Sequence, residues 1–183
     1  LQGLGSLLLD LVPAGRPVLP LYVPRGERDS AIPFLADELA ALFDELARIT
    51  GMRPNNETLM QAIRREERAD GLFSALVNTM GTSGLSSPDL YRVLRTREFL
   101  PAEEFERLAQ NVLDVPRAND TAKLPVILSG MVPEPMALLE TVEKAGGKVV
   151  GDDLACIGRR CYPQGTSEAP FVRMAESLLG AAP

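Results

Sequence analysis

The chain contains no histidine, and this absence excludes several kinds of catalytic and metal site. A Ser-His or Cys-His catalytic pair needs an imidazole as its base, and histidine-ligated zinc needs one as a ligand. The 183 residues therefore cannot form either kind of site by themselves. Cysteine occurs only as Cys156 and Cys161, which is too few for a disulfide scaffold. We therefore expect a reducing, cytoplasmic environment.

Long apolar runs and an excess of basic charge are also missing. No apolar run approaches the ~20 residues that a membrane-spanning helix needs. The apolar opening, residues 4–12, lacks the basic start of a signal peptide. The net charge of −6 argues against a nucleic-acid partner. Apolar residues still make up 45% of the chain, enough for a core. We expect a globular protein that binds neither membranes nor nucleic acids.

The part of the chain before residue 118 has mainly helical periodicity. Glycine, asparagine and proline at the expected positions mark where helices begin and end. Four helices are predicted, over 34–50, from Asn56 onward, from Pro88 onward and over 101–113. The charged run at 64–70 is expected to face solvent. Residues 17–23 could form a short strand, although Pro20 weakens that prediction.

The pattern changes after residue 118 to strand, helix, strand. Apolar β-rich runs at 124–130 and 148–151 flank an amphipathic helix over about 134–145. This spacing predicts two adjacent parallel strands with a right-handed crossover. Continuous apolar strands are typical of a parallel sheet covered on both faces. One further helical pattern follows at 168–180, but no third strand. We therefore expect that the chain is a piece of a larger polypeptide.

The stretch VVGDDLACIGRRCYP, residues 149–163, concentrates the chemistry of the chain. In open α/β sheets, ligands bind outside the carboxyl ends of the strands. Ser129 and Gly130 follow the first predicted strand, and Asp152 follows the second, so these loops should lie side by side. Cys156 is then expected near the position where such folds bind ligands.

Each of these residues also has a purely structural interpretation. A single cysteine is often a small buried hydrophobe, Asp152 and Asp153 could cap a following helix, and Arg159 could pair with those aspartates. A Cys156–Cys161 disulfide is geometrically possible but would be labile. Two cysteines alone cannot hold a metal or cluster without ligands from outside the chain.

The segments ILSG and LLETVEKAGGKVVGDDLACIGRR resemble the C-terminal domain of the 2-hydroxyacyl-CoA dehydratase D-component family, which includes benzoyl-CoA reductase subunits. The helical stretch beginning AIPFLADELAALF is also similar to this family. The resemblance implies an α/β protein of two Rossmann-like lobes joined by helices. Residues 1–30 would end the first lobe or form a linker, 31–118 would be the helical segment, and 119–183 would start the C-terminal Rossmann-like lobe.

The resemblance also implies a function, namely part of an iron–sulfur acyl-CoA dehydratase or reductase subunit. Members hold a [4Fe-4S] cluster on three cysteines, and an ATP-dependent activator protein supplies a low-potential electron that reaches a CoA thioester. Cys156 would be one thiolate ligand, with the others in the first lobe. A homologous second subunit, the activator and an acyl-CoA would be the partners. The candidates to contact substrate or the cluster surroundings are Ser129, Gly130, Asp152, Asp153 and Arg159.

The chain departs from the family pattern at the motif itself. Ala155 separates Asp-Asp-Leu from Cys156, whereas the cysteine often follows this tripeptide directly. Cys161 occupies a position not associated with a ligand, which makes it the second choice. Some family subunits carry no cysteine at the motif. The alternative is therefore a non-catalytic assembly subunit or paralogue whose cysteines are only structural; a generic ligand-binding α/β domain without redox chemistry is a third possibility.

Overall fold

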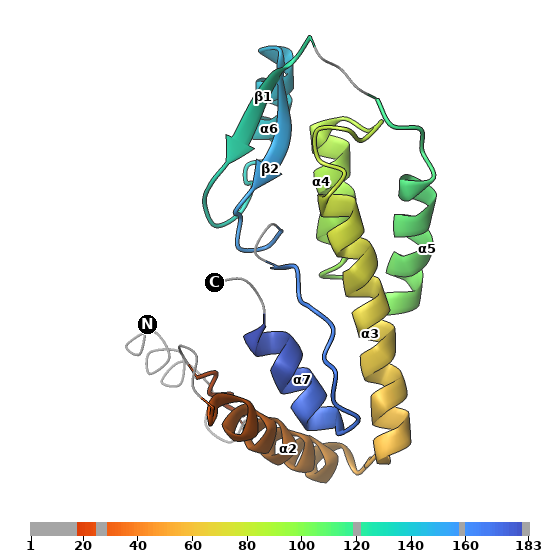
Figure 1. Ribbon diagram of the computed structural model, residues 1–183, viewed down its shortest axis with the longest axis vertical. Helices are drawn as coiled ribbons and strands as arrows, with labels where there is room; N and C mark the ends of the chain where they lie inside the picture. The colour runs from red at the N-terminus through yellow and green to blue at the C-terminus, as the bar shows by residue number, and fades with distance from the viewer. Residues whose placement is uncertain (1–17, 25–28, 119–121, 158–159, 181–183) are drawn as a thin grey trace.

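The computed structural model of the protein describes residues 18–24, 29–118, 122–157 and 160–180. Within these ranges the chain forms six helices and two strands, with the strands at one end of the molecule and two of the helices at the other (Figure 1). In chain order the elements are α2 (Ala31–Thr50), α3 (Asn56–Val77), α4 (Ser87–Thr96), α5 (Ala102–Leu113), β1 (Leu124–Leu128), α6 (Ala137–Lys144), β2 (Gly147–Asp152) and α7 (Pro170–Leu179). The predicted α/β class, helices followed by the start of a parallel sheet, is confirmed.

The helix boundaries follow from local capping signals. Gly51 ends α2 in a left-handed conformation at φ 71°, which glycine adopts without steric cost. The Asn55 side chain accepts a hydrogen bond from the Thr58 amide at 2.8 Å and so caps α3. Ser86 caps α4 in the same way. These local signals explain why the predicted helices are all found.

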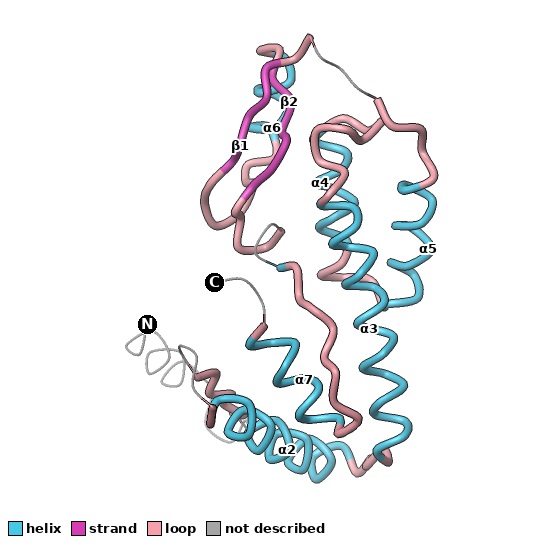
Figure 2. Tube along the Cα trace, viewed as in Figure 1, coloured by secondary structure: helices cyan, strands magenta, loops and turns pink. Residues whose placement is uncertain are grey.

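The two strands pair in parallel and α6 connects them (Figure 2). Their register places Leu124 opposite Gly147 and Leu128 opposite Asp152, with one irregularity after Val126. Strand β2 contacts the start of α4: the Val149 amide donates a hydrogen bond to Ser87 Oγ at 3.3 Å. The predicted strand–helix–strand unit with parallel strands is therefore confirmed.

One hydrophobic core joins the helical part to this unit. Buried side chains from α3, α4, α5, α6, β2 and the segment after β2 form a single cluster, which includes Phe73, Leu76, Tyr91, Leu94, Phe105, Leu139, Val149, Leu154 and Ile157. Helix α4 contacts α3 and α5 and also α6, the helix of the strand–helix–strand unit. In Figure 1 the strands lie at the same end of the molecule as α4. The sheet edge is thus fixed relative to α4, and this contact positions the residues discussed below. The domain boundaries proposed from sequence stay a prediction.

A second, smaller cluster packs α2 against α7. Its buried members are Leu35, Ala36, Leu39 and Ala175, and the Phe43 and Phe171 rings lie 5.5 Å apart between centroids. The Arg173 guanidinium on α7 pairs with Glu67 on α3, with two N–O distances of 2.8 Å. This ion pair joins α7 to the longest helix of the molecule.

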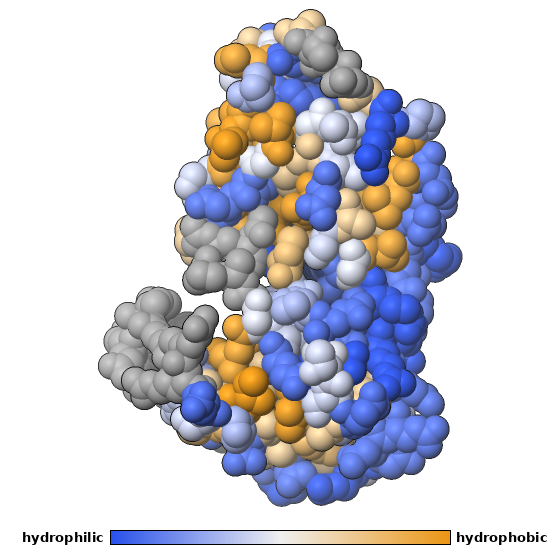
Figure 3. All heavy atoms as spheres, viewed as in Figure 1, coloured by the Kyte–Doolittle hydropathy of each residue, from blue (hydrophilic) through white to orange (hydrophobic). Residues whose placement is uncertain are grey.

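Three expectations from the sequence need correction. Residues 18–24 form no strand; Pro20 lacks the amide that a strand ladder requires. Within the charged run at 64–70, Glu67 and Ala69 are buried rather than solvated, because α5 and α7 pack on this part of α3. The described residues also leave β1 partly uncovered: Leu124 and Ile127 are 70% and 76% exposed, and Figure 3 shows apolar surface over this strand.

Candidate functional site

The loops after β1 and β2 meet at the carboxyl edge of the sheet, as predicted. The Asp153 amide donates to the Leu128 carbonyl at 3.1 Å, and the Gly130 amide donates to Asp153 Oδ1 at 3.3 Å. Gly130 has φ 151°, a value that favours glycine at this turn. Ser129 is exposed beside it. Asp153 therefore closes the two loops onto each other, while the functional roles predicted for these residues stay predictions.

Asp152 connects the end of β2 to α4 and to the chain ahead of Cys156. Its Oδ1 accepts a hydrogen bond from the Leu154 amide at 2.9 Å, which forms a local turn rather than a helix cap. Its Oδ2 accepts a hydrogen bond from the Tyr91 hydroxyl of α4. Burial, together with the neighbouring Asp152 carboxylate, raises the pKa of Tyr91 well above its usual range.

Cys156 lies in the turn that follows this junction. The Ile157 amide donates to the Leu154 carbonyl at 3.1 Å, and both of these residues are buried in the main core on either side of the cysteine. Cys156 itself is partly buried and packs against that core, as does Cys161. Both cysteines are free thiols. The thiol of Cys156 is thus held in one place by its apolar neighbours.

The electrostatic surroundings of Cys156 come largely from α4. Burial raises the pKa of its thiol; the Arg95 guanidinium lowers that pKa, and the Glu98 carboxylate raises it. Arg95 forms ion pairs with Glu134 at 2.8 Å and with Glu98 at 3.2 Å. Two arginines, Arg159 and Arg160, also follow Cys156 closely in the sequence. Arg159 lies outside the described residues, and Arg160 pairs with Glu98 at 3.5 Å.

Arg95 and Tyr91 were therefore missed by the sequence analysis. They lie four positions apart on α4, and so share one face of the helix, which is a local signal. Nothing local indicates that this face packs over the β2 loop. The contact of Tyr91 with Asp152 joins residues 61 positions apart in the chain.

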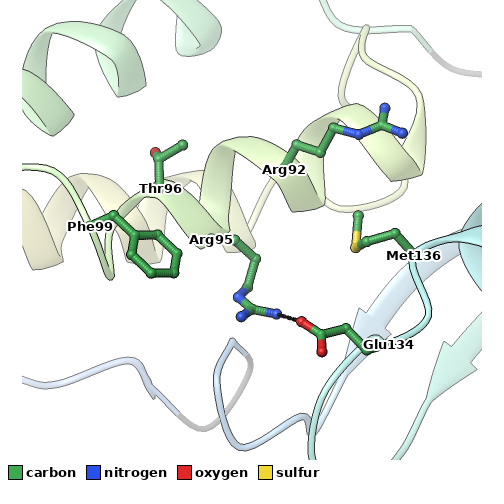
Figure 4. Close-up of a pocket in the computed structure, with 6 residues that line it drawn as sticks. All are labelled: Arg92, Arg95, Thr96, Phe99, Glu134 and Met136. Atoms are coloured by element: carbon green, nitrogen blue, oxygen red, sulfur yellow. Dashed lines mark hydrogen bonds and ion pairs between the residues drawn. The ribbon is translucent and has the colours of Figure 1, made fainter.

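A hollow of about 380 Å³ adjoins this site, between α4 and the segment after β1. Arg92, Arg95, Thr96 and Phe99 line it from α4 and its C-terminal end, and Glu134 and Met136 line it from the opposite side (Figure 4). The Phe99 ring is 76% exposed. Arg95 thus lines the hollow together with its partner Glu134, and its charge also acts on the Cys156 thiol.

The comparison with protein families identifies the chain. Residues 6–183 match the family model described as 2-hydroxyglutaryl-CoA dehydratase, D-component. The chain belongs to this family. The family resemblance inferred from the motif around Cys156 is thereby confirmed, and membership supports a dehydratase-type subunit. No curated protein sequence gives a significant match.

The described residues of this D-component chain offer few ligands for an iron–sulfur cluster. Such clusters are held mainly by several cysteine thiolates. Among the residues that the structure describes, no three or more His, Cys, Asp or Glu side chains are grouped to hold a metal ion. Cys156 fits as one thiolate of such a set, but the described residues alone do not complete it. None of the described helices is long and apolar enough to cross a membrane.

Proposed function

We propose that the chain is part of a 2-hydroxyacyl-CoA dehydratase subunit in which Cys156 supplies one thiolate ligand to a [4Fe-4S] cluster. The observation that carries the proposal is the place of Cys156, in a fixed turn at the carboxyl edge of two parallel strands. The remaining thiolate ligands would come from a first lobe outside these 183 residues, which contain no cysteine besides Cys156 and Cys161. When bound, the cluster would supply one-electron reduction of an acyl-CoA thioester.

The Arg95 guanidinium near Cys156 suits a thiolate ligand, against an effect of burial that raises the pKa of the thiol overall. The Arg95 charge favours the thiolate over the thiol, as a cation near a cysteine does. The partial burial of Cys156 against the core limits access by solvent. Ser129, Gly130 and Arg159 remain our candidates to face the substrate or the cluster. Asp153 holds the two loops together, and Asp152 holds the turn before Cys156.

The proposed partners follow from family membership. A D-component is one part of a larger assembly, so we expect a homologous second subunit, and we expect an ATP-dependent activator protein to deliver the electron. The substrate would be an acyl-CoA, and the reaction either loss of water or, as in benzoyl-CoA reductase subunits, reduction. A cytoplasmic location would suit these partners.

A second candidate function is a non-catalytic assembly subunit or paralogue with purely structural cysteines. It is favoured by a specific observation: both Cys156 and Cys161 pack against the main core. Burial also raises the pKa of the Cys156 thiol, which is the behaviour of an inert cysteine.

Cys156→Ser and Cys161→Ser in the full-length subunit, which would carry the other thiolates of the proposed cluster, separate these candidates when each protein is purified under anaerobic conditions. After reconstitution with iron and sulfide, we expect Cys156→Ser to lose most of the bound iron and the visible absorption of a cluster. Cys161→Ser should retain both. Loss of iron only in Cys161→Ser would show that Cys161, rather than Cys156, is the ligand. Full iron retention in both variants, or no iron in the unchanged protein, would support the structural role.

A further inference from the structure

The Tyr91 hydroxyl is the polar end of a side chain that is otherwise enclosed by the core. Tyr91 is 1% exposed, and its ring lies among the apolar residues of the main cluster. A buried tyrosine hydroxyl needs a hydrogen-bond partner, because leaving it unsatisfied is costly. The partner here is Asp152 Oδ2, on the last residue of β2. The hydroxyl therefore ties α4 to the start of the Cys156 turn.

The other oxygen of the same carboxylate holds the backbone that leads to Cys156. Asp152 Oδ1 accepts from the Leu154 amide at 2.9 Å. Leu154 is 3% exposed and Ile157 is fully buried, so apolar anchors stand on both sides of Cys156. The carboxylate thus sets the direction of the chain before the first anchor. The thiol position then depends on α4 as well as on the loop itself.

From this geometry we propose that Tyr91 and Asp152 are a positioning pair that fixes the Cys156 thiol. Neither residue acts on substrate in this role: the Tyr91 hydroxyl is enclosed, and both Asp152 oxygens hold local groups. The relevance to a cluster rests on the proposed function. The effect of the pair on the position of the thiol does not rest on it. The positioning proposal and the proposed function can therefore fail separately.

Alkylation of the metal-free protein with iodoacetamide tests the pair directly. Tyr91→Phe removes the hydroxyl and keeps the ring. We expect Cys156 to react about ten- to a hundredfold faster, the change in an opening equilibrium that loss of one hydrogen bond to a charged group produces. Cys161 should keep its rate. Trypsin cleaves between the two cysteines at Arg159 and Arg160, so mass spectrometry measures each rate separately.

Tyr22→Phe is the matched control, because this tyrosine is 64% exposed and its change should leave both rates unaltered. Asp152→Ala, which removes both acceptor oxygens, should resemble Tyr91→Phe, and it carries the same expectation if Tyr91→Phe does not fold. Its rates are compared after correction for the thiolate fraction, because the Asp152 charge also raises the pKa of Cys156. The double variant should react no faster than the faster single variant, since both changes break one link. An unchanged Cys156 rate, equal acceleration of both cysteines or additive effects in the double variant would each overturn the proposal. Iron retention by Cys156→Ser would instead refute the proposed function alone.

Discussion

At the scale of single residues, Gly165 occupies a position where no side chain fits. A Cβ placed there would lie 2.3 Å from the Arg173 carbonyl oxygen and 2.6 Å from its Cγ. The carbonyl belongs to α7 and can yield only if the helix shifts. We expect Gly165→Ala to lower the free energy of unfolding by about 1–3 kcal/mol, the usual cost of overpacking. Urea denaturation followed by circular dichroism measures this change.

Gly71 provides the contrasting case, because it lies exposed in the interior of α3. Its added Cβ would meet only Gln164 Nε2, at 4.0 Å. Alanine is favoured over glycine inside a helix by about 1 kcal/mol, so Gly71→Ala should raise the free energy of unfolding. If both alanine variants shift stability in the same direction, the path of the segment before α7 differs from the one described here.

At the scale of elements, the Glu67–Arg173 pair joins α3 to α7. Both side chains are about nine-tenths buried, and Glu67 Oε1 also accepts the Gly165 amide at 3.1 Å. Glu67→Gln leaves the Arg173 charge buried without its counter-ion. We expect a loss of about 3–5 kcal/mol in the free energy of unfolding, as when one partner of a buried ion pair is removed.

A second ion pair, which lies at the surface of the molecule, provides the matched control for Glu67 and Arg173. Glu168 pairs with Arg64 of α3 at 2.9 Å, but the two side chains are 80% and 49% exposed. Solvent screening limits such a pair to about 1 kcal/mol or less, so Glu168→Gln should change the urea midpoint little. If Glu67→Gln and Glu168→Gln lower the free energy of unfolding equally, the two ion pairs do not differ in burial as described.

The elements that sequence could predict are those specified by neighbouring residues. Asn55 and Gly51 mark helix boundaries through contacts within a few positions, and the parallel strands follow from their apolar runs around a short helix. The solvated face predicted for 64–70 was wrong at Glu67 because its partner Arg173 lies 106 positions away. The place of the loop after β2 at the carboxyl edge of the strands was predicted for the same local reason, whereas the contact of this loop with Tyr91 depends on helix packing.

At the scale of the whole molecule, the main core lies on one side of the small sheet. Helix α4 and its neighbours pack toward β2, while β1 presents Leu124 and Ile127 to the surroundings. The sequence predicted cover on both faces because apolar strands are usually enclosed. The residue pattern of a strand indicates how apolar the strand is, but it does not indicate which elements pack on it.

Two leucines of this unit test that one-sided core. Leu139 on α6 is fully buried, and Leu124 on β1 is 70% exposed. Leu139→Ala should lower the free energy of unfolding by about 2–5 kcal/mol, because it removes packed methyl groups and leaves a cavity. Leu124→Ala removes the same atoms from an exposed position, so its effect should stay within about 0.5 kcal/mol. Urea unfolding of the two variants at one protein concentration decides the matter: a large loss in Leu124→Ala would mean that the Leu124 side chain is covered in the folded protein.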